Sequence, residues 1–126
     1  MIKTMVLLKR RPDLSIAQFR EIYETGHAKL GERLLTGRAV RYMRRYLNGI
    51  PNPATGVPAE TEYDVATEIW FADRESFEAA MAMLGTPEVM AEVAADEATL
   101  FDRTHNRFFT VEEYESPCVA EAAAKP

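Results

Sequence analysis

Two stretches in the middle of the chain decide the fold: RAVRYMRRYLN at residues 38–48 and YDVATEIWF at residues 63–71. In each stretch the side chains alternate with a period of two, which is typical of a β-strand with two different faces. Residues 49–61 between them hold two glycines and three prolines, a composition that favours a surface loop or the mouth of a pocket. The sequence therefore predicts two successive strands with no helix between them.

Toward the amino terminus, an apolar strand is predicted at residues 2–9, followed by a turn. Ser15, with Gln18 three residues later, forms a capping-box pattern. Apolar residues then recur every three or four positions. This spacing predicts a helix over residues 15–35, ended by Gly37.

Toward the carboxyl terminus, Asp73 is suited to cap one helix, and the Thr86-Pro87 pair is suited to begin another. A last strand is predicted at about residues 104–115. Residues 116–126 carry no core-forming pattern, so we expect a flexible tail there.

The resulting order, β-α-β-β-α-β, predicts an α+β ferredoxin-like sandwich in one domain spanning residues 1–115. Its four-stranded antiparallel sheet would carry the helices on one face, and the other face would need a different cover. The apolar stripes of the helices and one face of the strands point toward a common core. The expected core residues are Phe19, Ile22, Leu30, Ile69, Phe71, Phe77, Met81 and Phe101.

Charge is divided unevenly along the 126 residues, although the net charge is only -5. Residues 1–48 carry 11 Lys and Arg against 4 acids, whereas residues 49–126 carry 4 against 16. Opposed halves predict contact with each other or with a second copy, not with nucleic acid, which needs a basic footprint. We expect a homodimer through the edge strands, with basic residues 38–45 of one chain near acidic residues 112–115 of the other.

Neither targeting nor membrane insertion is indicated. No apolar run approaches the ~20 residues that a membrane-spanning helix needs, so no membrane partner is expected. Residues 1–5 lack the pattern of a secretory signal, which favours a cytoplasmic location. Cys118 is the single cysteine and can form no internal disulfide, and the absence of close-spaced ligands argues against a metal site.

Three blocks of residues form a recurring pattern. Phe19, Tyr23, His27 and Leu30 follow one another along the first helix; Tyr63-Asp64 leads to Glu68-Ile69-Trp70-Phe71 and then Asp73; Asp96-Glu97, Phe101-Asp102 and Val111-Glu112-Glu113 complete it. Together these blocks resemble the EthD-type family over residues 1 to about 115. Glu24 departs from the family pattern, in which an aromatic residue, often Trp, commonly follows the helix tyrosine.

This resemblance implies a dimeric α+β barrel, in which the sheets of two chains close on each other. The relatives include ether-degrading oxygenases, lactone isomerases, polyketide cyclases and proteins of unknown role. Most of them need no metal or organic cofactor, so no cofactor is expected here.

His27 is the strongest catalytic candidate, because an imidazole exchanges a proton near pH ~6.5 and the family motif includes this histidine. The alternative is a histidine on the helix flank that is hydrogen-bonded to backbone or solvent. Tyr46, or Tyr42 in its place, and Arg44 are expected to polarise or position a substrate oxygen. Nothing local supports a role for His105, which is expected at the surface.

A second set of residues is expected to bind the substrate: Tyr23, Tyr42, Asp64, Glu68 and Trp70. Alternation puts Asp64, Glu68 and Trp70 on one strand face, which we expect to look into the barrel. The two carboxylates lie about 13 Å apart at ~3.3 Å per residue, so each needs another partner. The same parity argument offers Tyr42, Arg44 and Tyr46 as those partners. A structural ion pair is the alternative, above all for Glu68.

These features favour a pocket protein for a small aromatic or cyclic oxygenated compound. It would act as a cofactor-free lyase, isomerase or cyclase by proton transfer at His27. Two alternatives stay open: a non-catalytic ligand-binding or accessory protein for an oxygenase, and a cofactor-free monooxygenase. The element order also matches RNA recognition motifs, but Asp64 and Glu68 on the exposed sheet face would repel phosphate.

Overall fold

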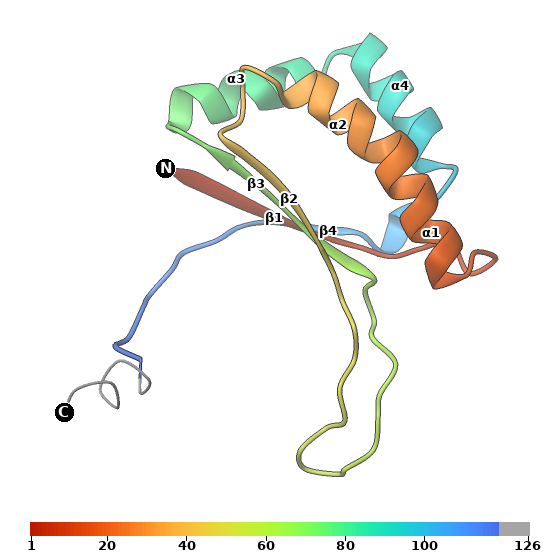
Figure 1. Ribbon diagram of the computed structural model, residues 1–126. Helices are drawn as coiled ribbons and strands as arrows, with labels where there is room; N and C mark the ends of the chain where they lie inside the picture. Colours follow the sequence, from red (N-terminus) through yellow and green to blue (C-terminus); the bar gives the residue numbers. More distant parts are fainter. Residues whose placement is uncertain (119–126) are drawn as a thin grey trace.

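The computed structural model describes residues 1–118 and contains a four-stranded antiparallel sheet with the strand order β2-β3-β1-β4. The strands are β1 (Ile2–Leu8), β2 (Arg41–Tyr46), β3 (Val65–Phe71) and β4 (Arg107–Thr110). The helices lie against one face of the sheet, as Figure 1 shows. The predicted ferredoxin-like α+β fold, with β2 and β4 as its edges, is confirmed.

One helical rod joins β1 to β2. It consists of α1 (Ile16–Ile22), a π-helical turn η1 (Tyr23–His27) and α2 (Ala28–Leu35). The predicted capping box begins it, because the Gln18 backbone N–H donates to Ser15 Oγ at 3.1 Å and the Ser15 N–H donates to Gln18 Oε1 at 2.9 Å. Gly37 follows the rod with a φ of 79°, a backbone conformation that favours glycine.

The second helical segment is a pair, α3 (Arg74–Leu84) and α4 (Pro87–Glu97). Asp73 caps α3 as predicted, since its Oδ1 accepts the backbone N–H of Ser76 at 2.7 Å. Within residues 1–118, no helix combines the length and the apolar character needed to cross a membrane.

The fourth strand is shorter than the predicted span of 104–115. Residues Arg103–His105 form a 3-10 turn (η2), so the strand begins only at Arg107. It ends at Thr110, which pairs with Thr4 of β1. Since β1 begins at Ile2, only two residues of β1 precede Thr4. Of the predicted tail, residues 116–118 lack secondary structure and are exposed, and the rest lies outside the described residues.

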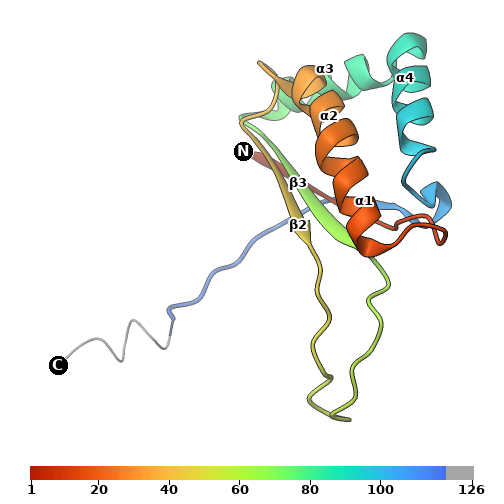
Figure 2. The same cartoon turned by 45° about the vertical axis from the view of Figure 1, so that its right-hand side comes forward.

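The connection between β2 and β3 is the predicted loop. It extends away from the sheet as a long hairpin, visible below the strands in Figures 1 and 2. A single bridge between Pro51 and Pro58 is the only pairing assigned within it.

The core lies between the helical rod and the sheet. Its largest fully buried side chains are Tyr23, Phe19, Phe71, Leu100 and Val65. Of the predicted core residues, Phe19, Phe71 and Phe101 are buried, whereas Ile22, Leu30, Ile69 and Phe77 are half-buried.

The prediction for Met81 is wrong, because this side chain is 41% exposed. The inward side of α3 is formed by Phe77, Ala80 and Leu84, at helical spacings of three and four. Met81 follows Ala80 by one position and is therefore turned about 100° away from that side.

The register of β2 corrects a predicted side-chain direction. Tyr42, Arg44 and Tyr46 lie opposite Ile69, Thr67 and Val65 of β3, so they share the helix-covered face of the sheet. They do not face Asp64, Glu68 and Trp70, as the sequence analysis expected. The alternation of side chains within β2 and within β3 agrees with the sequence pattern. Which face of β2 matches which face of β3 depends on the register between them, and the long loop that joins them does not fix that register.

No helix among residues 1–118 covers the opposite face of the sheet, which we call the open face (Figure 2). One row of paired residues on the open face contains one residue from each strand: Met43, Glu68, Met5 and Phe109. Trp70 also lies on it, with Lys3 Nζ 4.0 Å and Arg41 Cζ 4.7 Å from the ring centroid. The open face thus combines apolar side chains with cations stacked on an indole.

Truncating Phe71 to alanine should lower the free energy of unfolding by about 3–5 kcal/mol, because the change leaves a cavity in a fully buried site. Met81→Ala is the control and should cost about 1 kcal/mol or less, since Met81 is substantially exposed. Urea denaturation of both variants measures the difference. Equal losses would contradict this assignment of the core.

Candidate functional site

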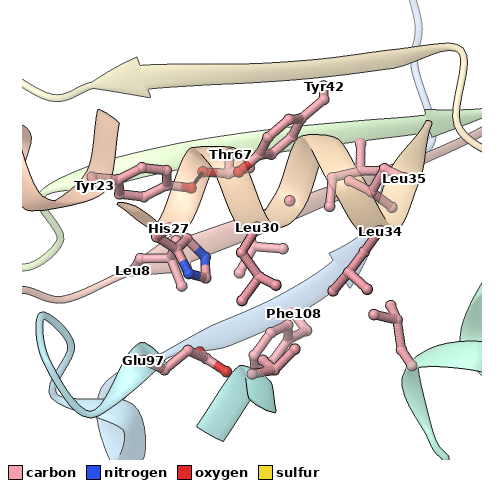
Figure 3. Close-up of a pocket in the computed structure, with 15 residues that line it drawn as sticks. Leu8, Tyr23, His27, Leu30, Leu34, Leu35, Tyr42, Thr67, Glu97 and Phe108 are labelled. Atoms are coloured by element: carbon pink, nitrogen blue, oxygen red, sulfur yellow. Dashed lines mark hydrogen bonds between the residues drawn. The ribbon is translucent and has the colours of Figure 1, made fainter. Parts of the chain in front are cut away.

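A cavity of about 150 Å³ lies between the helical rod, α4 and the helix-covered face of the sheet. Figure 3 shows it with the side chains that point toward it. Most of its wall is apolar and comes from Val6, Leu8, Leu30, Leu34, Leu35, Ile69, Leu84, Val93 and Phe108. Five side chains with polar atoms interrupt this wall: Tyr23, His27, Tyr42, Thr67 and Glu97. The cavity is therefore suited to an apolar ligand with a few polar groups.

His27 is held at the cavity wall by Asp96 of α4, whose Oδ2 lies 2.5 Å from His27 Nδ1. The rings of Tyr23 and Phe101 pack edge-on against the imidazole, each with its centroid 5.0 Å away. A carboxylate beside Nδ1 favours the tautomer with the proton on that nitrogen, which leaves the Nε2 lone pair as the acceptor. The arrangement can therefore orient an imidazole for proton transfer.

The π-helical turn η1 contains the motif residues Tyr23 and His27. Such a turn inserts one extra residue into a helix and often occurs at functional sites. In this rod the Ala28 N–H donates to the Tyr23 carbonyl, the five-residue step that defines the turn. Tyr23 and His27, at the two ends of this turn, both reach the cavity from the rod (Figure 3).

Tyr23 is a core residue as well as part of the wall. It is fully buried, and its hydroxyl is hydrogen-bonded to Thr67 Oγ1 at 2.7 Å. Burial raises the pKa of Tyr23 far above its ordinary value, so the hydroxyl stays protonated. Tyr23 therefore lies at the cavity wall, while its main contacts are structural.

Tyr42 and Glu97 contribute the other ionisable groups of the wall. Burial raises the pKa of the Tyr42 hydroxyl, which therefore remains a hydrogen-bond donor. Burial also raises the pKa of Glu97, and the opposing effect of nearby His27 is smaller. Sequence reasoning missed Asp96 and Glu97 as site residues, although both belong to the family-like pattern, because nothing in the spacing relates residue 96 to residue 27.

Arg44 and Tyr46 do not line the cavity. Both bind Glu24 of η1: Arg44 Nε and Nη2 donate to its carboxylate at 3.1 and 2.5 Å, and the Tyr46 hydroxyl donates at 2.6 Å. Hydrogen bonding from Arg44, and then from Tyr46, lowers the pKa of Glu24 despite its partial burial. These two predicted catalytic residues therefore lie away from His27. Both are hydrogen-bonded to Glu24, the residue that departs from the family pattern.

Asp64, Glu68 and Trp70 also lie outside the cavity. Asp64 accepts the Arg10 backbone N–H at 2.9 Å and the Arg10 Nε–H at 3.2 Å, which ties the end of β1 to the start of β3. Glu68 forms an ion pair with Arg45 at 3.3 Å. These contacts support the structural alternative for both carboxylates.

His105 lies at the surface as predicted, with its side chain 56% exposed and its Nδ1 2.7 Å from Asp102 Oδ2. In the part of the chain that the structure describes, no three His, Cys, Asp or Glu side chains gather as a metal site would require.

The fold and the site define a ferredoxin-like α+β protein with a histidine–carboxylate pair at a cavity between the helices and the sheet. The chain belongs to the EthD domain family, whose model matches residues 11–104. No curated protein sequence matches the chain significantly.

Solved structures agree on the fold. A protein of Arabidopsis thaliana, At3g17210, is 14% identical, with a TM-score of 0.60 over 94% of this chain and 100% of that one. A dimeric ferredoxin-like protein of unknown function from Bacteroides fragilis is 17% identical, with a TM-score of 0.56 over 89% and 95% of the two chains. A mutant of SnoaB, a cofactor-independent oxygenase from Streptomyces nogalater, is 11% identical, with a TM-score of 0.54 over 91% and 94%.

Acid should weaken the contribution of Glu24 to stability. Because its pKa is lower in the folded chain, this contribution is complete above the ordinary value of 4.5 and is lost as the pH falls through the folded value. Glu24→Gln should therefore cost about 1 kcal/mol at pH 7, as expected for a half-exposed ion pair, and progressively less as the pH falls below 4.5. Urea denaturation across this range measures the difference.

Glu32→Gln is the control, because Glu32 is exposed and its ion pair with Lys29 spans 3.6 Å. Its difference from the parent should stay small at every pH. A cost of Glu24→Gln that does not change with pH would contradict the assignment.

Proposed function

We propose that the chain binds a small cyclic compound with at least one oxygen function and catalyses a cofactor-free proton transfer on it, as a lyase, isomerase or cyclase. The observation that carries this proposal is the His27–Asp96 pair, with 2.5 Å between Nδ1 and Oδ2, at the wall of an apolar cavity. Membership of the EthD family is consistent with such a pocket but does not itself define the reaction.

In the proposed reaction, His27 Nε2 takes a proton from a carbon next to a carbonyl group. The electron pair of that C–H bond moves to the carbonyl oxygen and forms an enolate, while Asp96 stabilises the imidazolium. The same Nε2–H then returns the proton to another carbon of the ligand or to a leaving group. Asp96 acts as a positioning residue in this step, since it contacts the imidazole and not the ligand.

The remaining polar groups of the wall are suited to the oxygen of the ligand. The Tyr42 hydroxyl can donate to a developing enolate, and Glu97 can do so when it is protonated, a state that burial favours. In this proposal Tyr42, which the sequence offered as the alternative to Tyr46, has this role, and Glu97 takes the place of Arg44.

Cavity size supports a ligand of about one ring. A cavity of roughly 150 Å³ in another protein accommodates a benzene molecule, and this cavity has the same volume. A fused tricyclic compound would extend beyond this volume.

A cofactor-free monooxygenase is the second candidate, and the likeness to SnoaB is the observation that favours it. Oxygen consumption with a one-ring phenol would distinguish it from proton transfer alone. Binding without turnover of any kind would instead favour the ligand-binding or accessory role.

We also propose a homodimer in which the open faces of two copies meet and the edge strands β2 and β4 approach across the two-fold axis. The apolar side chains of the open face, including Phe109 at 45% exposed, need a cover, and the similar Bacteroides fragilis protein is dimeric. Ion pairs within the chain reduce the charge available for this contact, because Arg44 binds Glu24, Arg45 binds Glu68 and Lys3 binds Glu113. Apolar contact therefore carries more of the proposed interface than charge.

Proton abstraction can be measured without knowing the natural substrate. In deuterated buffer, the parent should exchange the hydrogens next to the carbonyl of 2-cyclohexen-1-one or δ-valerolactone faster than buffer alone, as followed by proton NMR. His27→Gln should lower the enzymatic rate by ~10²- to 10⁴-fold, because glutamine can hydrogen-bond but cannot take up the proton. Asp96→Asn should lower the rate while leaving ligand affinity nearly unchanged.

The chain provides a matched control for this experiment. His105 is also paired with an aspartate, but at the surface and away from the cavity, so His105→Gln should exchange like the parent. Equal rates for the His27 and His105 variants would overturn the catalytic assignment.

The dimer can be tested with two adjacent residues of β4 that lie on opposite faces of the sheet. Phe109→Glu, on the open face, should convert a particle of twice the 14.2 kDa chain mass into a monomer. Phe108→Glu, on the helix-covered side and 70% exposed, should leave the dimer intact. Light scattering at micromolar concentration measures both, and a monomeric parent would contradict the proposal.

A further inference from the structure

Gly31 lies in the interior of α2, where glycine is the least favourable residue after proline. A close approach explains its presence. A Cβ atom added at Gly31 would lie 2.6 Å from the Tyr42 hydroxyl oxygen and 2.8 Å from two carbons of its ring. Any other residue at this position would therefore displace the Tyr42 side chain or push α2 away from β2.

Tyr42 stands between two hollows of different character. On one side is the apolar cavity of about 150 Å³ that contains His27. On the other is a cleft of about 220 Å³ between α2 and β2, lined among others by Glu32, Arg41 and Arg44. Among residues 1–118, only Tyr42 and Leu35 line both hollows.

The partition between the hollows depends on the aromatic ring of Tyr42. Leu35 is 6% exposed and belongs to the end of the rod, so its position is set by the packing of α2. Tyr42 projects from the edge strand β2, and Figure 3 shows its ring at the cavity. Its hydroxyl and ring edge lie close to Gly31. Its ring is the larger of the two barriers and the one that a single substitution can remove without changing the rod.

We propose that Tyr42, seated on Gly31, is the specificity-determining wall of the cavity, which limits ligands to about one ring and closes off the arginine-containing cleft. This inference rests on the proposed function, since it concerns the substrate class of the same cavity. It predicts that removing the ring joins the two hollows into one longer site. Ligands with a second fused ring would then extend past the position of Tyr42.

Phenol and 2-naphthol are suitable probes, because they differ by one fused ring and carry the same hydroxyl group. NMR titration of the nitrogen-15-labelled full chain measures both dissociation constants and reports whether each variant is folded. The parent should bind phenol at least tenfold more tightly than 2-naphthol. Tyr42→Ala should reverse this preference, and Tyr42→Phe, which keeps the ring, should retain it.

Gly31→Ala tests the close contact between Gly31 and the Tyr42 ring without changing Tyr42 itself. It should change the ratio of the two dissociation constants by tenfold or more, because the new methyl group displaces the ring. Gly26→Ala is the matched control on the same rod, since a Cβ there meets nothing closer than Asp96 Oδ1 at 4.0 Å. That variant should bind both probes like the parent.

The outcomes separate this inference from the proposed function. If the parent binds phenol but folded Tyr42→Ala keeps the parent's preference for phenol, the proposed role of Tyr42 in ligand specificity is wrong, and the proposed function stands. If the parent binds 2-naphthol as tightly as phenol, the proposed role of Tyr42 in limiting ligand size is likewise contradicted. If the parent binds neither probe, the proposed function fails and this inference fails with it.

Discussion

The hydrogen bond between the Tyr23 hydroxyl and Thr67 connects the first helical rod to the central strand β3, and the geometry of the site follows from it. Both residues are buried, so each polar group depends on the other, and an unpaired one would cost about 1–3 kcal/mol. This contact, together with the burial of Phe19, Ala28 and Leu35 on the rod, fixes which side of the rod faces the sheet. His27 consequently reaches the cavity, Glu24 points toward Arg44, and Gly31 lies beneath Tyr42.

The two histidines illustrate how surroundings decide what a residue can do. Each has a carboxylate oxygen within hydrogen-bond distance of its Nδ1, so the pair by itself is not a signal of function. His105 is mostly exposed beside a 3-10 turn, whereas His27 is enclosed by aromatic rings at the wall of an apolar cavity. Of the two histidines, His27 is the one that lies at the wall of the cavity.

The uneven charge along the chain is explained largely within one molecule. Ion pairs join the basic first third to the acidic remainder, as in Arg10–Asp64, Arg33–Glu92 and Arg45–Glu68. The opposed halves predicted contact with each other or with a second copy, and these pairs show that they meet each other. Exposed pairs contribute little to stability, so their main effect is to orient the segments that they connect.

Local sequence patterns were enough to determine the element order, the helix starts at Ser15 and Asp73, and the α+β class, because caps and periodicity act over a few residues. They also singled out Tyr23, His27 and Tyr42, which do meet at the cavity. The partner of His27 lies 69 residues away in Asp96, and the side on which Arg44 and Tyr46 fall depends on the register of β2 against β3. Only the tertiary structure decided the partner of His27 and the side on which Arg44 and Tyr46 lie. Contacts between distant segments depend on how whole elements pack and pair, and no local spacing of residues encodes that arrangement.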